Sequence, residues 1–202
     1  MSASILPDAS ALLKASKLNI FDSQGKEVDF GTVFKKEKVI VVFIRHFFCG
    51  NCQQQYVEQL AAVPKDGLEK ASTKIVVVGC GEWNPIKSYA ETTGFQGTIF
   101  ADPSRQVYHA LGMDIKKLAG TPAGEKKRSY LITGRFSNAM LSIWKGPLKN
   151  LSLIGKQGNI SQLGGEFILG PGLECSYAYR MQHSEDHAEV ADLMKAAGVE
   201  LS

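Results

Sequence analysis

The sequence of 202 residues predicts an α/β fold in a single domain. Two continuous apolar runs, at 39–44 and 74–79, are typical of buried strands, and helical spacing follows each of them. A third strand ends at Ala101 and is again followed by signals of a helix start. Strands that alternate with helices in this way predict a largely parallel sheet covered on both faces.

Composition indicates an ordinary soluble globular protein, with 44% hydrophobic and 21% charged residues. The 23 Lys and Arg exceed the 20 Asp and Glu by only three, so the total charge favours no nucleic-acid partner. The N-terminus lacks the basic start, long apolar run and cleavage site of a secretory signal. The run at 39–44 is too short to span a bilayer. We therefore expect a cytoplasmic protein without stable membrane insertion.

The first elements are a hairpin, a buried strand and a helix. Apolar residues alternate on both sides of Ser23-Gln24-Gly25, which predicts a short hairpin at the edge of the fold. The strand at 39–44 follows, and then 50–62 carries apolar residues at helical spacing, with Pro64 just beyond the expected end.

The next two units each place a proline in the first turn of a helix. After the strand at 74–79, we expect a helix capped by Asn84 that ends at Gly94. After the strand that ends at Ala101, Asp102 is the expected cap and Gly112 the expected C-terminal end.

The C-terminal part predicts an antiparallel hairpin and a closing helix. The runs "GEFILG" and "ECSYAYR" are joined by Gly170-Pro171-Gly172, which is a hairpin signal. The last helix is expected over 185–197, with Ser184 before it and Gly198 at its end.

Residues 113–161 interrupt this rhythm and form a basic insertion, with nine Lys or Arg against two acidic residues. A solvated insertion packed onto the domain explains this charge. A docking face for an acidic partner, a membrane surface or a nucleic acid remains the alternative, and no nucleic-acid motif supports the last.

Cys49 and Cys52 form a Cys-x-x-Cys pair between the strand at 39–44 and the helix that follows. A thiol at a helix N-terminus meets backbone N–H groups, which favour the reactive thiolate, and Arg45 and His46 are auxiliary candidates nearby in sequence. A thiol one helical turn away can condense with a sulfenic acid to give a disulfide. The alternatives are two small buried residues or half a metal site. We expect no metal, because only His46 could complete such a site locally.

The other two cysteines follow or lie within predicted strands. Cys80 ends a strand at the sheet edge where α/β active sites gather, and Cys175 belongs to the last hairpin. A lone cysteine in such a place is usually a core residue, so a role as resolving thiol is the lesser interpretation for each.

Four stretches together resemble the peroxiredoxin-like 2 family of antioxidant enzymes: "FIRHFFCGNCQQQ", "FADPSRQVYHALGM", "QLGGEFILGPG" and "HAEVADLMKAAG". The resemblance implies a thioredoxin-like fold with a peroxiredoxin-type N-terminal hairpin and an insertion before the last β-hairpin. It also implies thiol redox chemistry, and some members are described as reducing lipid endoperoxides with electrons from thioredoxin. The peroxiredoxin frame makes Cys52 the peroxidatic residue, whereas the helix-terminus argument makes Cys49 the nucleophile.

We therefore expect a thiol-dependent peroxidase that reduces a hydroperoxide or endoperoxide through Cys49 and Cys52. The resemblance implies no bound cofactor, and thioredoxin or glutathione as the source of reducing equivalents. A thiol-disulfide oxidoreductase or redox sensor is one alternative. A non-catalytic interaction module with a basic docking surface is the other.

Overall fold

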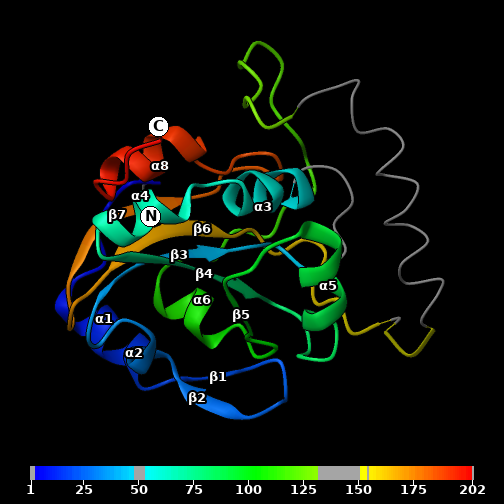
Figure 1. The fold of residues 1–202 in the computed structure, drawn as a ribbon. Helices are drawn as coiled ribbons and strands as arrows, with labels where there is room; N and C mark the ends of the chain where they lie inside the picture. The colour runs from blue at the N-terminus through cyan, green and yellow to red at the C-terminus, as the bar shows by residue number, and fades with distance from the viewer. Residues whose placement is uncertain (1–2, 48–52, 132–150, 154, 202) are drawn as a thin grey trace.

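The computed structural model describes residues 3–47, 53–131, 151–153 and 155–201 and shows a seven-stranded sheet with helices on both faces (Figure 1). The strand order is β2-β1-β5-β4-β3-β6-β7. The strands are β1 (Asn19–Phe21), β2 (Glu27–Asp29), β3 (Lys38–Phe43), β4 (Thr73–Gly79), β5 (Thr98–Ala101), β6 (Gly165–Leu169) and β7 (Cys175–Arg180). The helices are α1 (Ala9–Ser16), α2 (Phe30–Val33), α3 (Gln53–Ala61), α4 (Lys65–Lys70), α5 (Ile86–Thr93), α6 (Gln106–Ala110) and α8 (Val190–Ala196), with a 3-10 turn at Leu151–Leu153.

The α/β class is confirmed, but the expectation of a largely parallel sheet is wrong. Parallel pairing is confined to β3, β4 and β5, while β1 pairs antiparallel with β5 and β6 pairs antiparallel with β3. The two expected hairpins, β1–β2 and β6–β7, form the opposite edges of the sheet. The two strands of a hairpin run in opposite directions and therefore pair antiparallel. The helical crossovers between β3, β4 and β5 permit parallel pairing.

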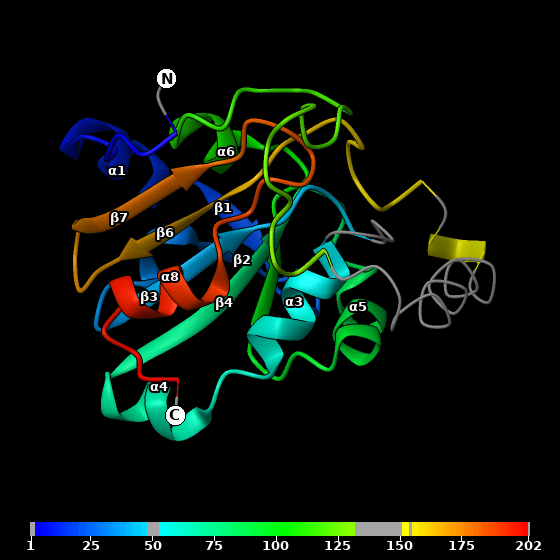
Figure 2. The same ribbon diagram turned by 90° about the horizontal axis from the view of Figure 1, so that it is seen from above.

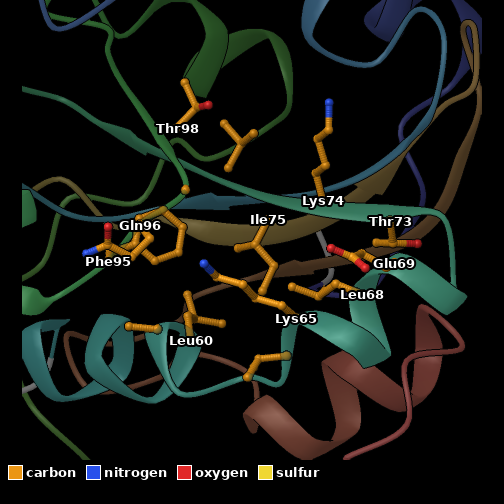
Figure 3. Close-up of a pocket in the computed structure, with 14 residues that line it drawn as sticks. Leu60, Lys65, Leu68, Glu69, Thr73, Lys74, Ile75, Phe95, Gln96 and Thr98 are labelled. Carbon is orange, nitrogen blue, oxygen red and sulfur yellow. The ribbon is translucent and has the colours of Figure 1, made fainter.

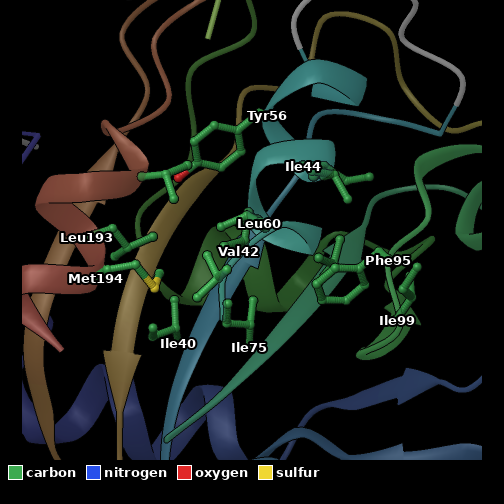
Figure 4. Close-up of a cluster of buried hydrophobic side chains, with 14 of the residues drawn as sticks. Ile40, Val42, Ile44, Tyr56, Leu60, Ile75, Phe95, Ile99, Leu193 and Met194 are labelled. Carbon is green, nitrogen blue, oxygen red and sulfur yellow. The ribbon is translucent and has the colours of Figure 1, made fainter. Parts of the chain in front are cut away.

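Two apolar cores lie on the two faces of the sheet (Figures 1 and 2). Helices α3, α5 and α8 cover one face, and α1, α2 and α6 cover the other. The alternation of side chains along β3 explains this division, since Ile40 and Val42 face the first core while Val39, Val41 and Phe43 face the second. Figure 4 shows side chains of the first core converging from α3, α8 and the central strands. Burying each such aliphatic side chain stabilises the fold by about 1.5–3 kcal/mol.

The last helix begins five residues later than the sequence predicts, at Val190 instead of 185, and its N-cap is Glu189 instead of Ser184. The N–H groups of the preceding segment bind outside the helix. The N–H of His187 donates to the Tyr130 hydroxyl, and that of Ala188 donates to the Glu166 carboxylate. Because side chains from elsewhere in the fold accept hydrogen bonds from these N–H groups, the segment can remain non-helical without leaving buried N–H groups unpaired.

Two further helix starts differ from the expected ones by a few residues. The cap of α5 is Pro85 instead of Asn84. Helix α6 begins at Gln106, although the Asp102 side chain does accept from the N–H of Val107 at 2.9 Å. Helices α1 and α4 were not predicted from the sequence. Each buries too few residues to produce a clear helical spacing of apolar side chains.

The described flanks of the basic insertion at 113–161 pack against the domain. Met113, Tyr130 and Leu153 are buried, and a single β-bridge joins Lys116 to Gln162. These contacts tie both flanks to the core. Whether the insertion as a whole can be shortened stays a prediction.

Among the residues that the structure describes, no helix combines the length and apolarity needed to cross a membrane.

Candidate functional site

The candidate site lies where β3 ends and α3 begins. Strand β3 ends at Phe43 and α3 starts at Gln53, so the expected strand and helix on the two sides of the Cys-x-x-Cys are confirmed. Cys49 and Cys52 themselves lie outside the described residues. The site is therefore built from the residues that surround this connection, at the edge formed by the carboxyl ends of β3, β4 and β5.

Arg45 follows β3 and is buried, with 6% of its surface exposed. Its Nη2 donates to the carbonyl oxygen of Ile160 at 2.5 Å, and its own carbonyl oxygen accepts from the Cys80 thiol at 2.5 Å. The N–H of Phe47 donates to the carbonyl of Gln157 at 2.9 Å. Residues 157–160 thus cross this edge of the sheet and hold the start of the connection in place.

His46 is buried as a neutral imidazole. Desolvation, with a smaller contribution from the charge of Arg45, lowers its pKa to about 4. Its Nδ1 lies 2.8 Å from the carbonyl oxygen of Phe47, which requires the proton on Nδ1 and leaves Nε2 as an acceptor. His46 therefore carries no positive charge at neutral pH that could stabilise a thiolate.

Tyr108 and Asp102 brace the same edge from the opposite face of the sheet. The Tyr108 hydroxyl lies 2.7 Å from the carbonyl oxygen of Ile44 and 2.8 Å from that of Val78. Asp102 is fully buried, and burial raises the pKa of its carboxyl against the hydrogen bonds from Ser104 and Val107. Sequence reasoning assigned Asp102 only to a helix cap and did not single out Tyr108.

Arg105 is a further positive group that sequence reasoning missed. Its charge lowers the pKa of the Cys80 thiol, although burial dominates and raises that pKa to about 12. One guanidinium nitrogen, Nη1, is buried without a hydrogen-bond partner among the described residues. Arg105 also adopts φ 59°, which is uncommon for a residue with a side chain and clusters at functional sites. The signal in the sequence was the loop "DPSRQ" directly after a parallel strand.

The remaining thiols have poorly reactive surroundings. Cys80 is buried, and its raised pKa keeps it protonated at neutral pH. Cys175 pairs with Leu169, which in turn pairs with Val39, so it lies at the opposite end of β3 from Phe43. Burial also raises the pKa of the Cys175 thiol. The raised pKa of both thiols and the distant position of Cys175 argue against either residue as a resolving thiol.

A pocket of about 330 Å³ lies at the far end of α3, away from the connection that carries the cysteines (Figure 3). Leu60, Leu68, Ile75 and Phe95 form its apolar part, and Figure 3 shows Lys65 extended across it. Because β4 and β5 begin rather than end here, this pocket lies at the opposite edge of the sheet from the carboxyl ends of β3, β4 and β5.

Within the described ranges, no three His, Cys, Asp or Glu side chains gather as potential metal ligands.

Comparison with known proteins identifies the family. Residues 59–183 match the family described as "AhpC/TSA antioxidant enzyme". The chain is also 32% identical to human peroxiredoxin-like 2C over 96% of its length and 84% of the relative's. The chain belongs to the AhpC/TSA antioxidant enzyme family. The matched range begins after Cys52, so it supports the fold and family without reaching the two cysteines.

Other relatives and solved structures agree with this family. A zebrafish prostamide/prostaglandin F synthase is 26% identical over 87% of the chain and 81% of the relative. Peroxiredoxin Q of Xanthomonas campestris superposes with a TM-score of 0.58 at 15% identity, covering 98% of this chain and 96% of that one. Peroxiredoxin 6 of Arenicola marina superposes with a TM-score of 0.59 at 11% identity, covering 96% and 71%. These structures confirm the expected thioredoxin-like, peroxiredoxin-type fold.

Proposed function

We propose that this protein is a thiol peroxidase that reduces a hydroperoxide or endoperoxide through Cys49 and Cys52. One thiolate attacks the O–O bond of a hydroperoxide, which releases an alcohol and leaves a sulfenic acid on sulfur. The second thiol then condenses with the sulfenic acid to give a disulfide and one water. The disulfide is returned to two thiols by a dithiol reductant of the thioredoxin type or by glutathione.

The observation that carries this proposal is the position of the Cys-x-x-Cys in a family of antioxidant enzymes. In the sequence the pair lies between β3 and α3, and β3 ends at the carboxyl edge of the parallel strands. Ligand and active sites of α/β sheets gather at that edge. A helix start also favours a thiolate over a thiol.

Two arginines among the described residues can supply positive charge to the reaction. The Arg45 guanidinium donates to the carbonyl oxygen of Ile160, and the charge of Arg105 lowers the pKa of the Cys80 thiol, which follows β4. Guanidinium groups remain charged at every working pH, whereas the buried His46 is neutral. We therefore assign thiolate and peroxide stabilisation to the arginines and a packing role, with Nε2 as acceptor, to His46.

The relatives suggest the substrate class. The zebrafish protein and its salmon counterpart, 25% identical over 93% of this chain, are both named prostamide/prostaglandin F synthase. Their name supports testing an oxidised lipid beside hydrogen peroxide. A lipid hydroperoxide and a cyclic lipid endoperoxide are the two probes to compare.

The test measures peroxide consumption by the pre-reduced protein, first in single-turnover stopped-flow mixing and then in steady-state turnover with thioredoxin or glutathione as reductant. We expect Cys49→Ser and Cys52→Ser to lose turnover by more than about 100-fold, because each removes one partner of the disulfide. Cys175→Ser is the matched control, since that thiol lies at the far end of β3, and it should keep wild-type rates. Full turnover by either variant of the pair would overturn the proposal. Reduction of protein disulfides without peroxide consumption would favour the oxidoreductase alternative.

Low-pH alkylation with peptide mass mapping decides the order of the two thiols. The thiol with the lower pKa is labelled first. The helix-terminus argument predicts Cys49, and the peroxiredoxin frame predicts Cys52.

A further inference from the structure

The pocket at the amino-terminal edge of the parallel strands arises from a stagger between β4 and β5. Strand β4 begins at Thr73, but its pairing with β5 begins only where Val76 lies opposite Thr98. The first residues of β4 therefore extend past the start of β5. Helices α3 and α4 and the connection from α5 to β5 surround this step, and the space between them has a volume of about 330 Å³ (Figure 3).

The floor of this pocket is apolar. Leu60 of α3, Ile75 of β4 and Phe95 before β5 line it, and all three are buried members of the first core. Leu68 of α4 is half-buried and adds a further apolar side chain. A chain of methylene groups in this pocket would replace water against core side chains. Each fully buried methylene group strengthens such binding by about fourfold.

Lys65 brings a positive charge to this apolar floor. Figure 3 shows its side chain extended across the pocket, with the ammonium group directed towards Phe95 and Gln96. Lys65 forms no ion pair with another residue that the structure describes. The other lysine of the pocket, Lys74, pairs with Glu37 at 2.6 Å, and Figure 3 shows it on the opposite side of β4 from the floor. The ammonium group of Lys65 is therefore the one placed to meet an anion.

The opposite end of the pocket carries a negative charge. The Glu69 carboxylate lies beside Thr73, on the other side of Leu68 from the Lys65 ammonium group (Figure 3). A ligand with one negative charge would be attracted at the Lys65 end and repelled at the Glu69 end. The two charges therefore favour one orientation of such a ligand in the pocket.

We propose that this pocket binds a medium-chain fatty acid, with its alkyl chain on the apolar floor and its carboxylate on the Lys65 ammonium group. At about 30 Å³ for each water-sized group, a volume of 330 Å³ holds about ten methylene groups. Apolar walls with a small number of placed polar groups are typical of small-molecule sites. The carboxylate is the headgroup that a single ammonium group at the rim matches.

This site is separate from the proposed peroxidase reaction. The pocket lies where β4 and β5 begin, whereas Arg45 and Arg105 lie towards the edge where the parallel strands end. Binding of a fatty acid at the pocket therefore needs neither a peroxide nor a reductant, and the two proposals can fail independently.

The test is calorimetric titration of the full-length protein at neutral pH with octanoate, decanoate and dodecanoate, each below the concentration at which it forms micelles. We expect one site per chain and an affinity that rises by about two- to fourfold for each added methylene group up to about ten carbons. Decanol lacks the charge and should bind about fivefold more weakly than decanoate. Decyltrimethylammonium carries the opposite charge and should bind more weakly still.

A charge reversal at Lys65 tests the headgroup contact. Lys65→Glu should weaken decanoate binding by about tenfold and leave decanol binding unchanged, because it replaces an attraction by a repulsion. Lys70→Glu is the matched control, since Lys70 lies on the same helix but does not line the pocket. Both lysines are exposed, so both variants should unfold at the wild-type temperature.

Methyl NMR of the wild-type protein locates the ligand. Decanoate should shift the methyl resonances of Leu60, Leu68 and Ile75 and leave those of Leu12 and Leu111 in the second core unchanged. Any one of four results overturns the inference: no saturable binding, shifts confined to residues outside the pocket, equal weakening by Lys70→Glu, or tighter binding of decyltrimethylammonium than of decanoate. None of these measurements involves peroxide, so they leave the peroxidase proposal to its own test.

Discussion

The imidazole of His46 shows how burial decides which side chains carry charge near the candidate site. A histidine beside an arginine and a cysteine pair in the sequence is a natural candidate for a cation. The structure buries it against Phe47, where desolvation favours the neutral ring. Among the described residues, Arg45 and Arg105 supply positive charge at this edge of the sheet, and only Arg45 was expected from the sequence.

His46 predicts a pH dependence of stability. Its pKa is about 4 in the folded state, below the ordinary histidine value of 6.5, so the unfolded chain binds a proton at a higher pH than the folded one. The free energy of unfolding should therefore fall as pH drops from 6.5 towards 4, by about 2–3 kcal/mol from this group alone. Urea unfolding at several pH values checks this, and His46→Gln should remove that part of the slope. If the pH dependence of stability is unchanged in the variant, His46 binds its proton over the same pH range in the folded and unfolded states, which contradicts the prediction.

The residues that the sequence could and could not indicate differ in how far their partners lie along the chain. The Cys-x-x-Cys between a strand and a helix is a local pattern, and its flanking elements were predicted from periodicity alone. The partner of Glu166 is His187, 21 positions away, and no local rule pairs them. The available signal was a glutamate inside the apolar strand "GEFIL", because a buried carboxylate needs a partner.

At the scale of elements, the segment between β7 and α8 illustrates how tertiary contacts override helical pattern. The apolar spacing predicted a helix from 185, yet the carboxylates of this segment bind residues 121–129 instead. Glu185 accepts from Thr121, Asp186 from Arg128, and Glu189 from Ser129. Such partners cannot be read from periodicity, because they lie on the flank of an insertion about 60 positions earlier.

Arg128→Met should destabilise the protein through this segment. Asp186 is buried, and its ion pair with Arg128 at 2.5 Å would be lost, although the Tyr179 hydroxyl and the N–H of Gln182 still donate to it. We expect the free energy of unfolding to fall by about 1–3 kcal/mol, the cost of leaving a buried charge partly unpaired. Urea unfolding measures this loss. Lys127→Met is the matched control on the exposed neighbour and should change stability by less than about 0.5 kcal/mol.

In the whole molecule, the residues proposed for the chemistry lie towards one edge of the sheet. Strand β3 leads into the connection to α3 at that edge, and Arg45 and Arg105 lie close to it. The hairpins β1–β2 and β6–β7 flank these strands on either side (Figure 2). This arrangement lets a long basic insertion enter between α6 and β6 without interrupting the sheet.

The insertion at 113–161 supplies a prediction at this scale, and its flanks define where a deletion should be made. Tyr130 is buried against Tyr56, with ring centroids 5.1 Å apart, and Leu153 is buried as well. We expect replacement of 132–150 by a short Gly-Ser linker to preserve cooperative unfolding, because the flanks that pack on the domain at Tyr130 and Leu153 remain in place. In contrast, Tyr130→Ala should lower the free energy of unfolding by about 3–5 kcal/mol, as for other large-to-small core substitutions.

Urea unfolding followed by circular dichroism measures both changes, and peroxide turnover of the shortened protein gives a second readout. Loss of cooperative unfolding in the shortened protein would show that 132–150 complete the core. Cooperative unfolding with lost turnover would assign those residues to substrate access, since the flanks that pack on the domain at Tyr130 and Leu153 would still be present.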